Sequence, residues 1–235
     1  MDFFTDASLN DEKGVAGIGC LCVDGSREVS EIIVPCHVNN IHTAELCALA
    51  FAVRKAAKLD VRSARIVSDS VSAINILHNY MKCIKSGKMD AEQKKFLQFI
   101  ERTPYQKAIL ENIVDTFKNS SVSYQFVHTD AHQKSSEVGS DAYWNKRADK
   151  AAKKGKKFAE TIMENEQIQR PEELLDFPFV NGNCADDWRS RVQVPQVQAK
   201  PKNKTVPKKV SRHRKNMEDT CNVRIMVNVR INVRR

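Results

Sequence analysis

The first forty residues alternate between short apolar runs and turn residues, a pattern typical of β-strands. Three such runs cover residues 2–8, 14–24 and 28–37. Asp24 followed by Gly25, between the second and third runs, favours a tight hairpin turn. We therefore expect an antiparallel meander at the start of the domain. Gly17 and Gly19 in its second strand predict a bulge or a close approach by another part of the backbone.

From residue 43 onward the apolar positions recur at helical spacing instead. Helices are predicted over residues 43–59, 71–81, 91–101, 104–118 and 142–165. Pro104 stands where a proline is tolerated in a first helical turn. Short buried strands are predicted over residues 64–68 and 121–128. This order predicts an α/β fold in which a mixed sheet carries helices on its faces.

The composition changes after residue 165 and divides the chain into a folded unit, residues 1–165, and an extension, residues 166–235. The extension begins acidic, ends basic, and is expected to be largely flexible. Residues 192–215 are rich in Pro, Gln, Lys and Arg, and we expect them to bury too little apolar surface to fold. In residues 223–233 every second residue is Val or Ile, which is a strand pattern. Whether that strand joins a sheet edge, pairs with a partner or frays is left open.

The charge is divided unevenly between these parts, within a net charge of +9. Residues 188–235 contain 14 Lys and Arg against 2 Asp and Glu, a net charge of +12. The rest of the chain has 24 basic and 27 acidic residues, a net charge of −3. A basic tail on a near-neutral domain is typical of proteins that bind phosphate backbones, so we expect the tail to bind nucleic acid. A solvated tail that only aids solubility is the alternative.

Neither a membrane span nor a disulfide framework is expected. No run of eighteen apolar residues occurs, and the N-terminus lacks the pattern of a secretory signal. Seven scattered cysteines without a Cys-x-x-Cys pair favour reduced thiols over disulfides or a zinc site. We therefore expect a cytoplasmic protein. The basic stretch at residues 208–215 leaves a nuclear location open in a nucleated host.

Four acidic residues fall where the predicted elements bring remote parts of the chain together. They are Asp6 in the first strand, Glu45 near the start of the first long helix, Asp69 at the end of the central strand and Asp149 in the last helix. Strand ends and first helical turns converge at one edge of a sheet. Crowded carboxylates repel one another unless divalent cations neutralise them, and Mg²⁺ prefers oxygen ligands of this kind. Taken singly, each acid is more often a turn residue, a helix cap or a solvated side chain.

The sequence around these acids resembles ribonuclease H of type 1. The likeness rests on FFTDAS (3–8) with its downstream glycines, HTAELCAL (42–49), IVSDS (66–70), and DAH (130–132) with NKRADKAAK (145–153). It spans about residues 1–155. The resemblance implies a five-stranded mixed sheet flanked by helices. It also implies an endonuclease that hydrolyses the RNA strand of RNA–DNA hybrids with two Mg²⁺ ions, for which Mn²⁺ can substitute, leaving 5′-phosphate and 3′-hydroxyl ends.

The same resemblance implies a role for each acid. Asp6 would bridge both metal ions, whereas Glu45 and Asp69 would hold the ion beside the leaving 3′ oxygen. Asp149 would share the ion that activates the attacking water. His132 matches the family's mobile histidine, which shuttles protons or helps the product to leave.

Other features bear on substrate binding. The loop between residues 132 and 145 is longer than in the common bacterial form, and His128 nearby is the alternative mobile histidine. The family's usual Asn pair before the helical acid is out of register, so contacts to RNA 2′-hydroxyls are expected partly from backbone groups near Ser8, Asn10 and Thr43. The rest of the predicted substrate-binding set is Ser70, Asn145, Lys82, Lys85 and Lys88. The three lysines fall where many members carry a basic, substrate-gripping protrusion, and a solvated helical face is the alternative.

Two further readings of the function are open. The chain could be the ribonuclease H domain of a reverse-transcribing element, or a related two-metal nuclease acting on another substrate, although the lack of a polymerase segment favours a free-standing enzyme. A monomer is expected. It could also be a hybrid-binding protein that keeps the fold without activity, although four intact acids favour an enzyme. Because the first catalytic strand starts at residue 2, no separate hybrid-binding module is expected before it. The basic tail is hypothesised to substitute for that module.

Overall fold

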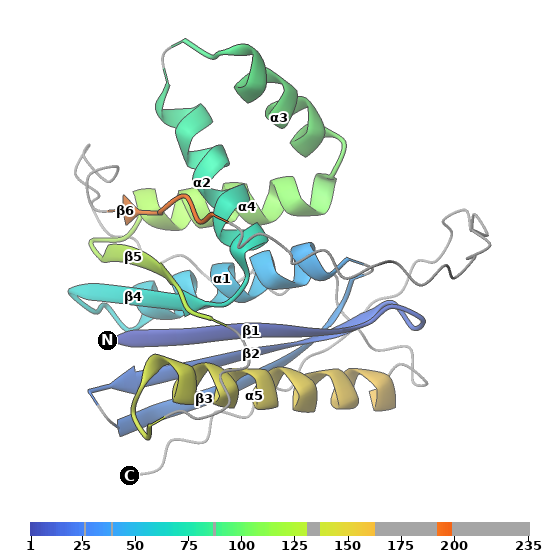
Figure 1. The fold of residues 1–235 in the computed structure, drawn as a ribbon, viewed down its shortest axis with the longest axis vertical. Helices are drawn as coiled ribbons and strands as arrows, with labels where there is room; N and C mark the ends of the chain where they lie inside the picture. The colour runs from blue at the N-terminus through green and yellow to red at the C-terminus, as the bar shows by residue number, and fades with distance from the viewer. Residues whose placement is uncertain (26, 39, 87, 131–136, 163–191, 199–235) are drawn as a thin grey trace, which may run out of the picture.

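A computed structural model of the chain describes residues 1–25, 27–38, 40–86, 88–130, 137–162 and 192–198. The strands among them are β1 (Asp2–Asn10), β2 (Val15–Asp24), β3 (Arg27–His37), β4 (Ser63–Ser68), β5 (Ser123–His128) and β6 (Val192–Gln193). The helices are α1 (Ile41–Lys58), α2 (Val71–Lys85), α3 (Ala91–Glu101), α4 (Pro104–Lys118) and α5 (Asp141–Ile162). The strands form one mixed sheet in the order β3-β2-β1-β4-β5-β6 (Figure 1).

The first three strands form the predicted antiparallel meander. β1 pairs with β2, with Asp6 opposite Gly19, and β2 pairs with β3. The turn between β2 and β3 contains Gly25, whose φ of +61° lies in the left-handed region that glycine adopts without steric cost. The remaining strands run parallel to β1, since β4 pairs with β1, β5 with β4 and β6 with β5. The predicted fold class is therefore confirmed.

The sheet has a sixth strand that the sequence did not lead us to expect. We predicted that residues 192–215 would not fold, and for residues 192–198 this prediction is wrong. Val192 is buried beside β5, and Val194 and Val197 pack partly against the main core. Three valines within six residues bury enough apolar surface to hold this short segment, although the surrounding composition is polar.

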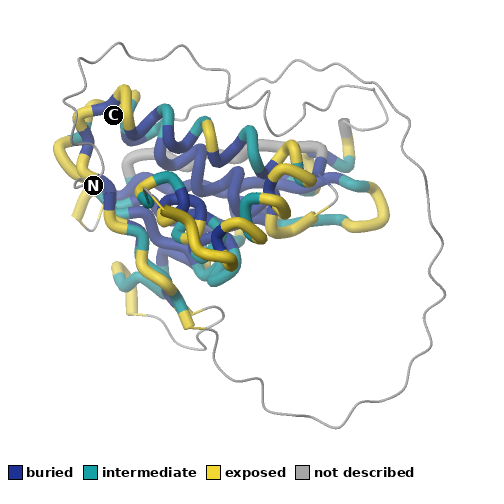
Figure 2. The backbone as a smooth tube through the Cα atoms, turned by 90° about the horizontal axis from the view of Figure 1, so that it is seen from above, coloured by how far each residue is buried: buried dark blue, intermediate teal, exposed yellow. Residues whose placement is uncertain are grey.

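Alternate residues of each strand supply two hydrophobic layers, one on each face of the sheet. Helix α1, supported by α2 and α4, covers the face that contains Phe3, Ile18 and Cys20. Helix α5 covers the other face, where Trp144 and Ala148 pack against the side chains of Phe4, Leu21 and Val67. Because both faces are covered, the strands read as nearly continuous apolar runs. Buried residues accordingly fill the centre of the molecule, and exposed residues lie at its turns and on the outer sides of its helices (Figure 2).

Helix α5 lies directly on β2 because two glycines leave room for it. A Cβ atom at Gly17 would come within 2.2 Å of the Ala152 carbonyl oxygen, and one at Gly19 within 2.3 Å of the Ala148 carbonyl oxygen. No side chain fits in that space, so the close approach predicted for these glycines is confirmed. The position of α5 matters for function because the helix carries one of the four predicted acids.

The helix boundaries follow local capping chemistry. Helix α1 begins two residues earlier than predicted, because the Asn40 side chain accepts a hydrogen bond from the His42 amide. Helix α4 begins with Pro104, as predicted. Helix α5 is capped by Ser140, whose hydroxyl accepts from the Tyr143 amide. Within the described part of the chain, no helix is both long and apolar enough to cross a lipid bilayer.

Candidate active site

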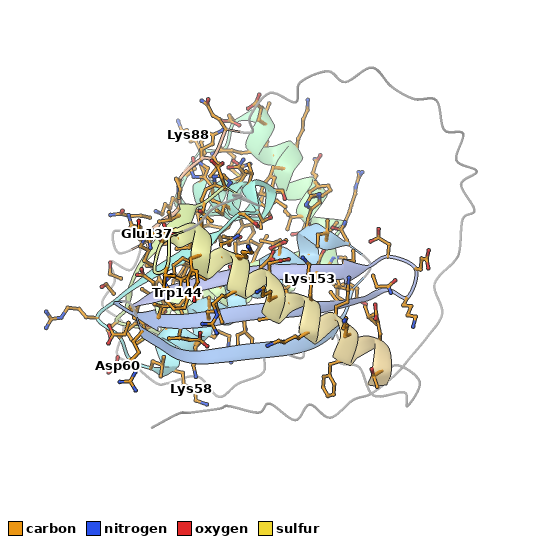
Figure 3. All side chains as sticks on the ribbon, turned by 60° about the horizontal axis from the view of Figure 1, so that its bottom comes forward. Lys58, Asp60, Lys88, Glu137, Trp144 and Lys153 are labelled. Carbon is orange, nitrogen blue, oxygen red and sulfur yellow. The ribbon has the colours of Figure 1, made fainter. Side chains whose placement is uncertain are left out.

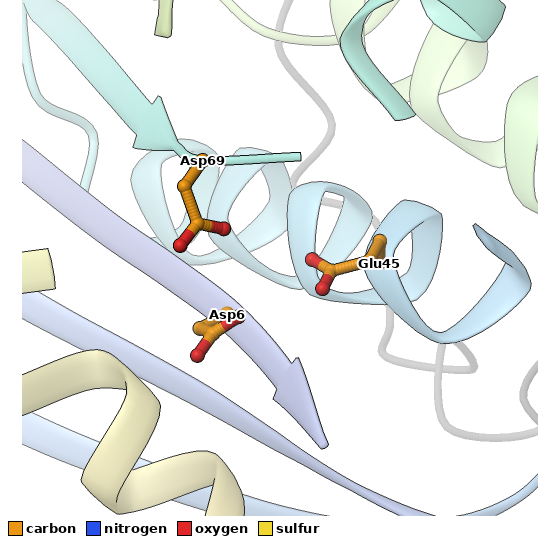
Figure 4. A group of neighbouring side chains, drawn as sticks. All are labelled: Asp6, Glu45 and Asp69. Atoms are coloured by element: carbon orange, nitrogen blue, oxygen red, sulfur yellow. The ribbon is translucent and has the colours of Figure 1, made fainter. Parts of the chain in front are cut away.

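Three of the four predicted acids meet at the edge of the sheet where β4 ends. Asp6 lies within β1, Asp69 directly follows β4, and Glu45 comes from the second turn of α1. The parallel register pairs Thr5 with Ser68. The next residue of each chain segment is therefore an acid, Asp6 within β1 and Asp69 just beyond the end of β4. One carboxylate oxygen from each of the three acids lies within 4.8 Å of the other two (Figure 4). We call these three residues the acidic cluster.

Helix α1 is held so that Glu45 faces the sheet. The Asn40 cap fixes where the helix starts. In the first turn of α1, the Thr43 hydroxyl accepts a hydrogen bond of 3.1 Å from the Gln106 side-chain amide of α4. Twelve residues of α1 are buried, Glu45 among them. The helix therefore delivers a carboxylate into the protein interior, where an ionised group is costly without a partner.

The acidic cluster is electrostatically strained in the absence of cations. Asp6 and Glu45 are each only 7% exposed. The pKa of Asp6 is raised from 3.8 to about 8, first by burial and then by the charges of Asp69 and Asp149. The pKa of Glu45 is raised well above its usual range by burial and then by Asp6 and Asp69. Without cations, this site favours protonated carboxyls at neutral pH.

The donor set fits a hard divalent cation. The Oε2 atom of Glu45 is buried and has no hydrogen-bond partner, so a buried acceptor of this carboxylate is left unsatisfied. The ligand atoms on offer are all carboxylate oxygens, the chemistry that Mg²⁺ and Mn²⁺ prefer. Asp69 is also oriented from outside the cluster, because the Asn145 side-chain amide donates to its Oδ2 atom at 3.0 Å. Outer hydrogen bonds of this kind orient metal-binding carboxylates.

The fourth acid, Asp149, lies beside the acidic cluster but is not one of its members. Gly19, which pairs with Asp6, lies against the backbone of Ala148, so α5 brings Asp149 close to β1. Its charge is near enough to raise the pKa of Asp6, after burial and Asp69. Its Oδ2 atom accepts a bond of 2.7 Å from the ammonium of Lys153, one turn further along α5.

The histidine predictions remain untested. His132, the predicted mobile histidine, lies outside the described residues. The alternative, His128, is the last residue of β5 and is half-buried. Both therefore stay predictions.

The predicted substrate-binding residues belong to β1, α1, α2 and α5 or adjoin α2 in the sequence, and their contacts with substrate stay predictions. Thr43 and Asn145 are buried, with polar atoms bonded to Gln106 and Asp69 respectively. The other polar members are half-buried: Ser8 in β1, Asn10 at its end, where it bonds Glu160, and Ser70 as the cap of α2. The lysines are exposed: Lys82 and Lys85 at the C-terminal end of α2, and Lys88 just beyond it, at the end of the molecule that α2 and α3 form (Figure 3).

Two polar residues at the rim were not singled out from the sequence. His42 is exposed on α1, one turn before Glu45, and its Nδ1 atom lies 2.8 Å from the Ser72 hydroxyl. Ser72 in turn lies 3.3 Å from the hydroxyl of Ser70, which directly follows Asp69. For His42 the available signal was its spacing of three residues from Glu45, because residues three apart share a helix face. Asp69 precedes α2, so no such signal was available for Ser72.

Comparison with known proteins gives one family match. Residues 1–157 match the family model of RNase H. No curated protein matches the chain.

Solved structures with a related fold have low sequence identity to this chain. One is RNase H1 from the halophilic archaeon Halobacterium salinarum, with 15% identity, a TM-score of 0.44 and coverage of 66% of this chain and 95% of the other. Another is the N-terminal RNase H domain of a Mycobacterium tuberculosis protein, fused to maltose-binding protein, with 15% identity, a TM-score of 0.46, and 69% and 96% covered. A third is a foamy viral protease–reverse transcriptase in complex with an RNA/DNA hybrid, with 18% identity and a TM-score of 0.46. That match covers 66% of this chain and 20% of the viral protein.

Proposed function

Since its residues 1–157 match the family model, this chain belongs to the RNase H family, and we propose that it hydrolyses the RNA strand of RNA–DNA hybrids with divalent metal ions. The observation that carries the proposal is the acidic cluster, with three carboxylate oxygens within 4.8 Å of one another. The buried, unpartnered oxygen of Glu45 supports it, because a cation is the partner that such an acceptor lacks. The expected products have 5′-phosphate and 3′-hydroxyl ends.

Asp6, Glu45, Asp69 and Asp149 would hold two Mg²⁺ ions, with Mn²⁺ as a substitute. Bound there, two such ions supply an activated water and stabilise the leaving oxygen. The charges of both Asp69 and Asp149 act on Asp6, which would contact both ions, whereas Glu45 and Asp69 would serve the side of the leaving group. Asp149 would be a ligand on the side of the attacking water, and its Oδ2 atom accepts a hydrogen bond from the Lys153 ammonium.

The remaining residues act on protons and on the substrate. His132 would carry protons or assist product release. Asn145 keeps Asp69 in one orientation through its amide. Ser8, Asn10, Thr43 and Ser70 would contact the RNA strand through hydroxyl, amide or backbone groups.

Two groups of basic residues would bind the phosphates of the duplex. Lys82, which is 13 residues beyond Asp69, lies about 20 Å along α2 from the site. Together with Lys85 and Lys88 it would contact phosphates at that distance, which positions a duplex without reading its sequence. The basic tail would bind phosphates as well. We propose that the enzyme acts as a monomer.

A substrate panel tests the proposed reaction. The purified protein with Mg²⁺ is mixed in turn with a labelled RNA–DNA hybrid, double-stranded RNA and double-stranded DNA, and the ends of the products are identified. We expect internal cuts in the RNA of the hybrid only, with 5′-phosphate ends. Equal cutting of double-stranded DNA would point to another two-metal nuclease. Binding of the hybrid without any cut would indicate a protein that keeps the fold and lacks the activity.

A further inference from the structure

Residues 192–198, which we call the docked segment, lie against the outer side of strand β5 and along α2. The segment begins as β6, where Val192 and Gln193 pair in parallel with Tyr124 and Gln125 of β5. Beyond β6 its apolar side chains, Val194 and Val197, pack partly against the main core. In Figure 1 the segment is the orange trace that runs from β6 toward α2.

Two side chains of α2 bind the backbone of the docked segment. The Nδ1 atom of His78 lies 2.7 Å from the Val194 carbonyl oxygen. Because a carbonyl oxygen can only accept, Nδ1 carries the hydrogen. Asn75 makes two bonds to a single residue: its amide nitrogen donates to the Val197 carbonyl at 2.7 Å, and its Oδ1 accepts from the Val197 amide at 2.7 Å. A pair of bonds to one residue fixes both its position and its direction.

These contacts show which way the docked segment runs. Helix α2 starts two residues after Asp69 and leads away from the acidic cluster. Val194 contacts His78, and Val197 contacts Asn75, which is nearer the start of the helix. The segment therefore runs back toward the cluster. Asn75 is six residues from Asp69, which is about 9 Å along a helix.

The chain continues from this point with its most basic part. Residues 199–235 contain 12 Lys and Arg against 2 Asp and Glu, a net charge of +10. We propose that Asn75 and His78 are positioning residues that hold the docked segment, so that the basic residues start beside the acidic cluster and bind the phosphates of the same duplex. This inference rests on the proposed function for the identity of the duplex. A tail whose start is already fixed loses less freedom on binding, and its effective concentration at the site is higher.

The plain alternative is that the docked segment only covers an exposed strand. The outer edge of β5 would otherwise present unpaired backbone groups, and proteins commonly cover such edges. Under that alternative, loss of the Asn75 contacts affects stability in the same way whatever the charge of the tail. The two explanations therefore differ in one respect: whether the effect of Asn75→Ala on hybrid binding depends on the charge of the tail.

A double-mutant cycle on the full-length protein separates the two explanations. Asn75→Ala is combined with a neutral-tail variant, in which the 12 Lys and Arg of residues 199–235 are replaced by Gln. Binding of a labelled RNA–DNA hybrid is measured in EDTA, where no cleavage occurs, at several salt concentrations. Asn79→Ala is the matched control, because Asn79 is exposed on the same helix. Val197→Pro removes the Val197 amide donor without changing α2, and it replaces Asn75→Ala if that variant does not fold.

With the native tail, Asn75→Ala or Val197→Pro is expected to weaken binding by about threefold to tenfold and to reduce the salt dependence. In the neutral-tail variant neither substitution should change binding further. Equal weakening with both tails, or no weakening with the native tail, would overturn the proposal. Failure of the proposed function is recognised separately, as wild-type protein that leaves the hybrid uncut when Mg²⁺ is present.

Discussion

At the residue scale, the acidic cluster contains two carboxyl groups, Asp6 and Glu45, whose pKa values are raised by burial and by neighbouring charges. The folded state keeps a proton on Asp6 up to about pH 8, whereas an unfolded aspartate releases it near 3.8. Between these values the folded protein binds more protons than the unfolded chain, so this group's contribution to stability falls as the pH rises. Cations favour the ionised form and oppose that loss.

Substitution of Asp6 by Asn is predicted to remove the part of the pH dependence that comes from Asp6, whereas the buried Glu45 keeps a raised pKa in both proteins. In EDTA, the melting temperature of the wild type should fall relative to that of Asp6→Asn as the pH rises from about 4 to about 8, because only the wild type has the Asp6 proton to lose. Added Mg²⁺ should raise the melting temperature of the wild type more at pH 8 than at pH 5. Parallel melting curves for the two proteins across this range would contradict the electrostatic account of the cluster.

Asn145 is predicted to act on catalysis by orienting Asp69. Asn145→Ala removes the amide that donates to Asp69 Oδ2, and loss of an outer partner of a metal ligand costs about tenfold to a hundredfold in metal affinity or activity. Steady-state kinetics at several Mg²⁺ concentrations should show a lower kcat and a higher Mg²⁺ requirement with little change in KM. A change confined to KM would instead indicate that Asn145 mainly contacts the substrate.

At the element scale, the predictable features are those with a strong period or a local signal. The meander was predictable from short apolar runs bounded by Gly25, and α1 from its stripe of apolar residues. The start of α1 was missed by two residues because the cap at Asn40 depends on a side-chain bond and not on periodicity. The two-residue strand β6 was missed because so short a segment, followed by Pro195, has no period to detect.

The glycines of β2 were recognised as sites of close approach, and the structure identifies α5 as the approaching element. Gly19→Ala is predicted to push α5 away from the sheet, because its Cβ would lie 2.3 Å from the Ala148 carbonyl oxygen. Overpacking of this kind costs about 1–3 kcal/mol of stability. Because α5 carries Asp149, activity should fall even at temperatures where the variant is folded.

Denaturant unfolding and a cleavage assay on the same preparations check this prediction. Gly25→Ala is the matched control, since its Cβ meets no atom within 4 Å but its positive φ imposes a local cost. The control should lose some stability and keep its activity. A Gly19→Ala variant as stable and active as the wild type would show that α5 is not held by this contact.

At the scale of the whole molecule, local sequence motifs predicted the convergence of Asp6, Glu45 and Asp69, which the structure confirms. The docked segment was not predictable in the same way, because it joins residues 122 positions apart through one asparagine and the backbone of Val197. Such a contact leaves no repeating pattern in the sequence. The pairing of Asp149 with Lys153 likewise depends on side-chain orientations that spacing alone does not fix.

Removal of the basic tail is predicted to weaken the use of long substrates. Truncation after Gln198 keeps the docked segment and removes 12 Lys and Arg. The KM for long hybrids should rise, and its dependence on salt should become flatter, because fewer phosphate contacts release fewer counterions. The KM for hybrids too short to reach the tail should change little. An unchanged KM and salt dependence on long hybrids would mean that the tail does not bind the substrate.

The central claim is that the acidic cluster holds divalent ions to cut RNA in a hybrid, and single-turnover cleavage during a Mg²⁺ titration tests it most directly. Wild type, Asp69→Asn and the matched control Asp115→Asn, on the outer helix α4, are compared at equal concentration. We predict Mg²⁺-dependent cleavage by wild type and control, and a rate lower by about a hundredfold to a thousandfold in Asp69→Asn, which still binds the hybrid. Folded wild-type protein that leaves the RNA intact at every Mg²⁺ concentration, or Asp69→Asn that cuts as fast as wild type, would contradict the claim.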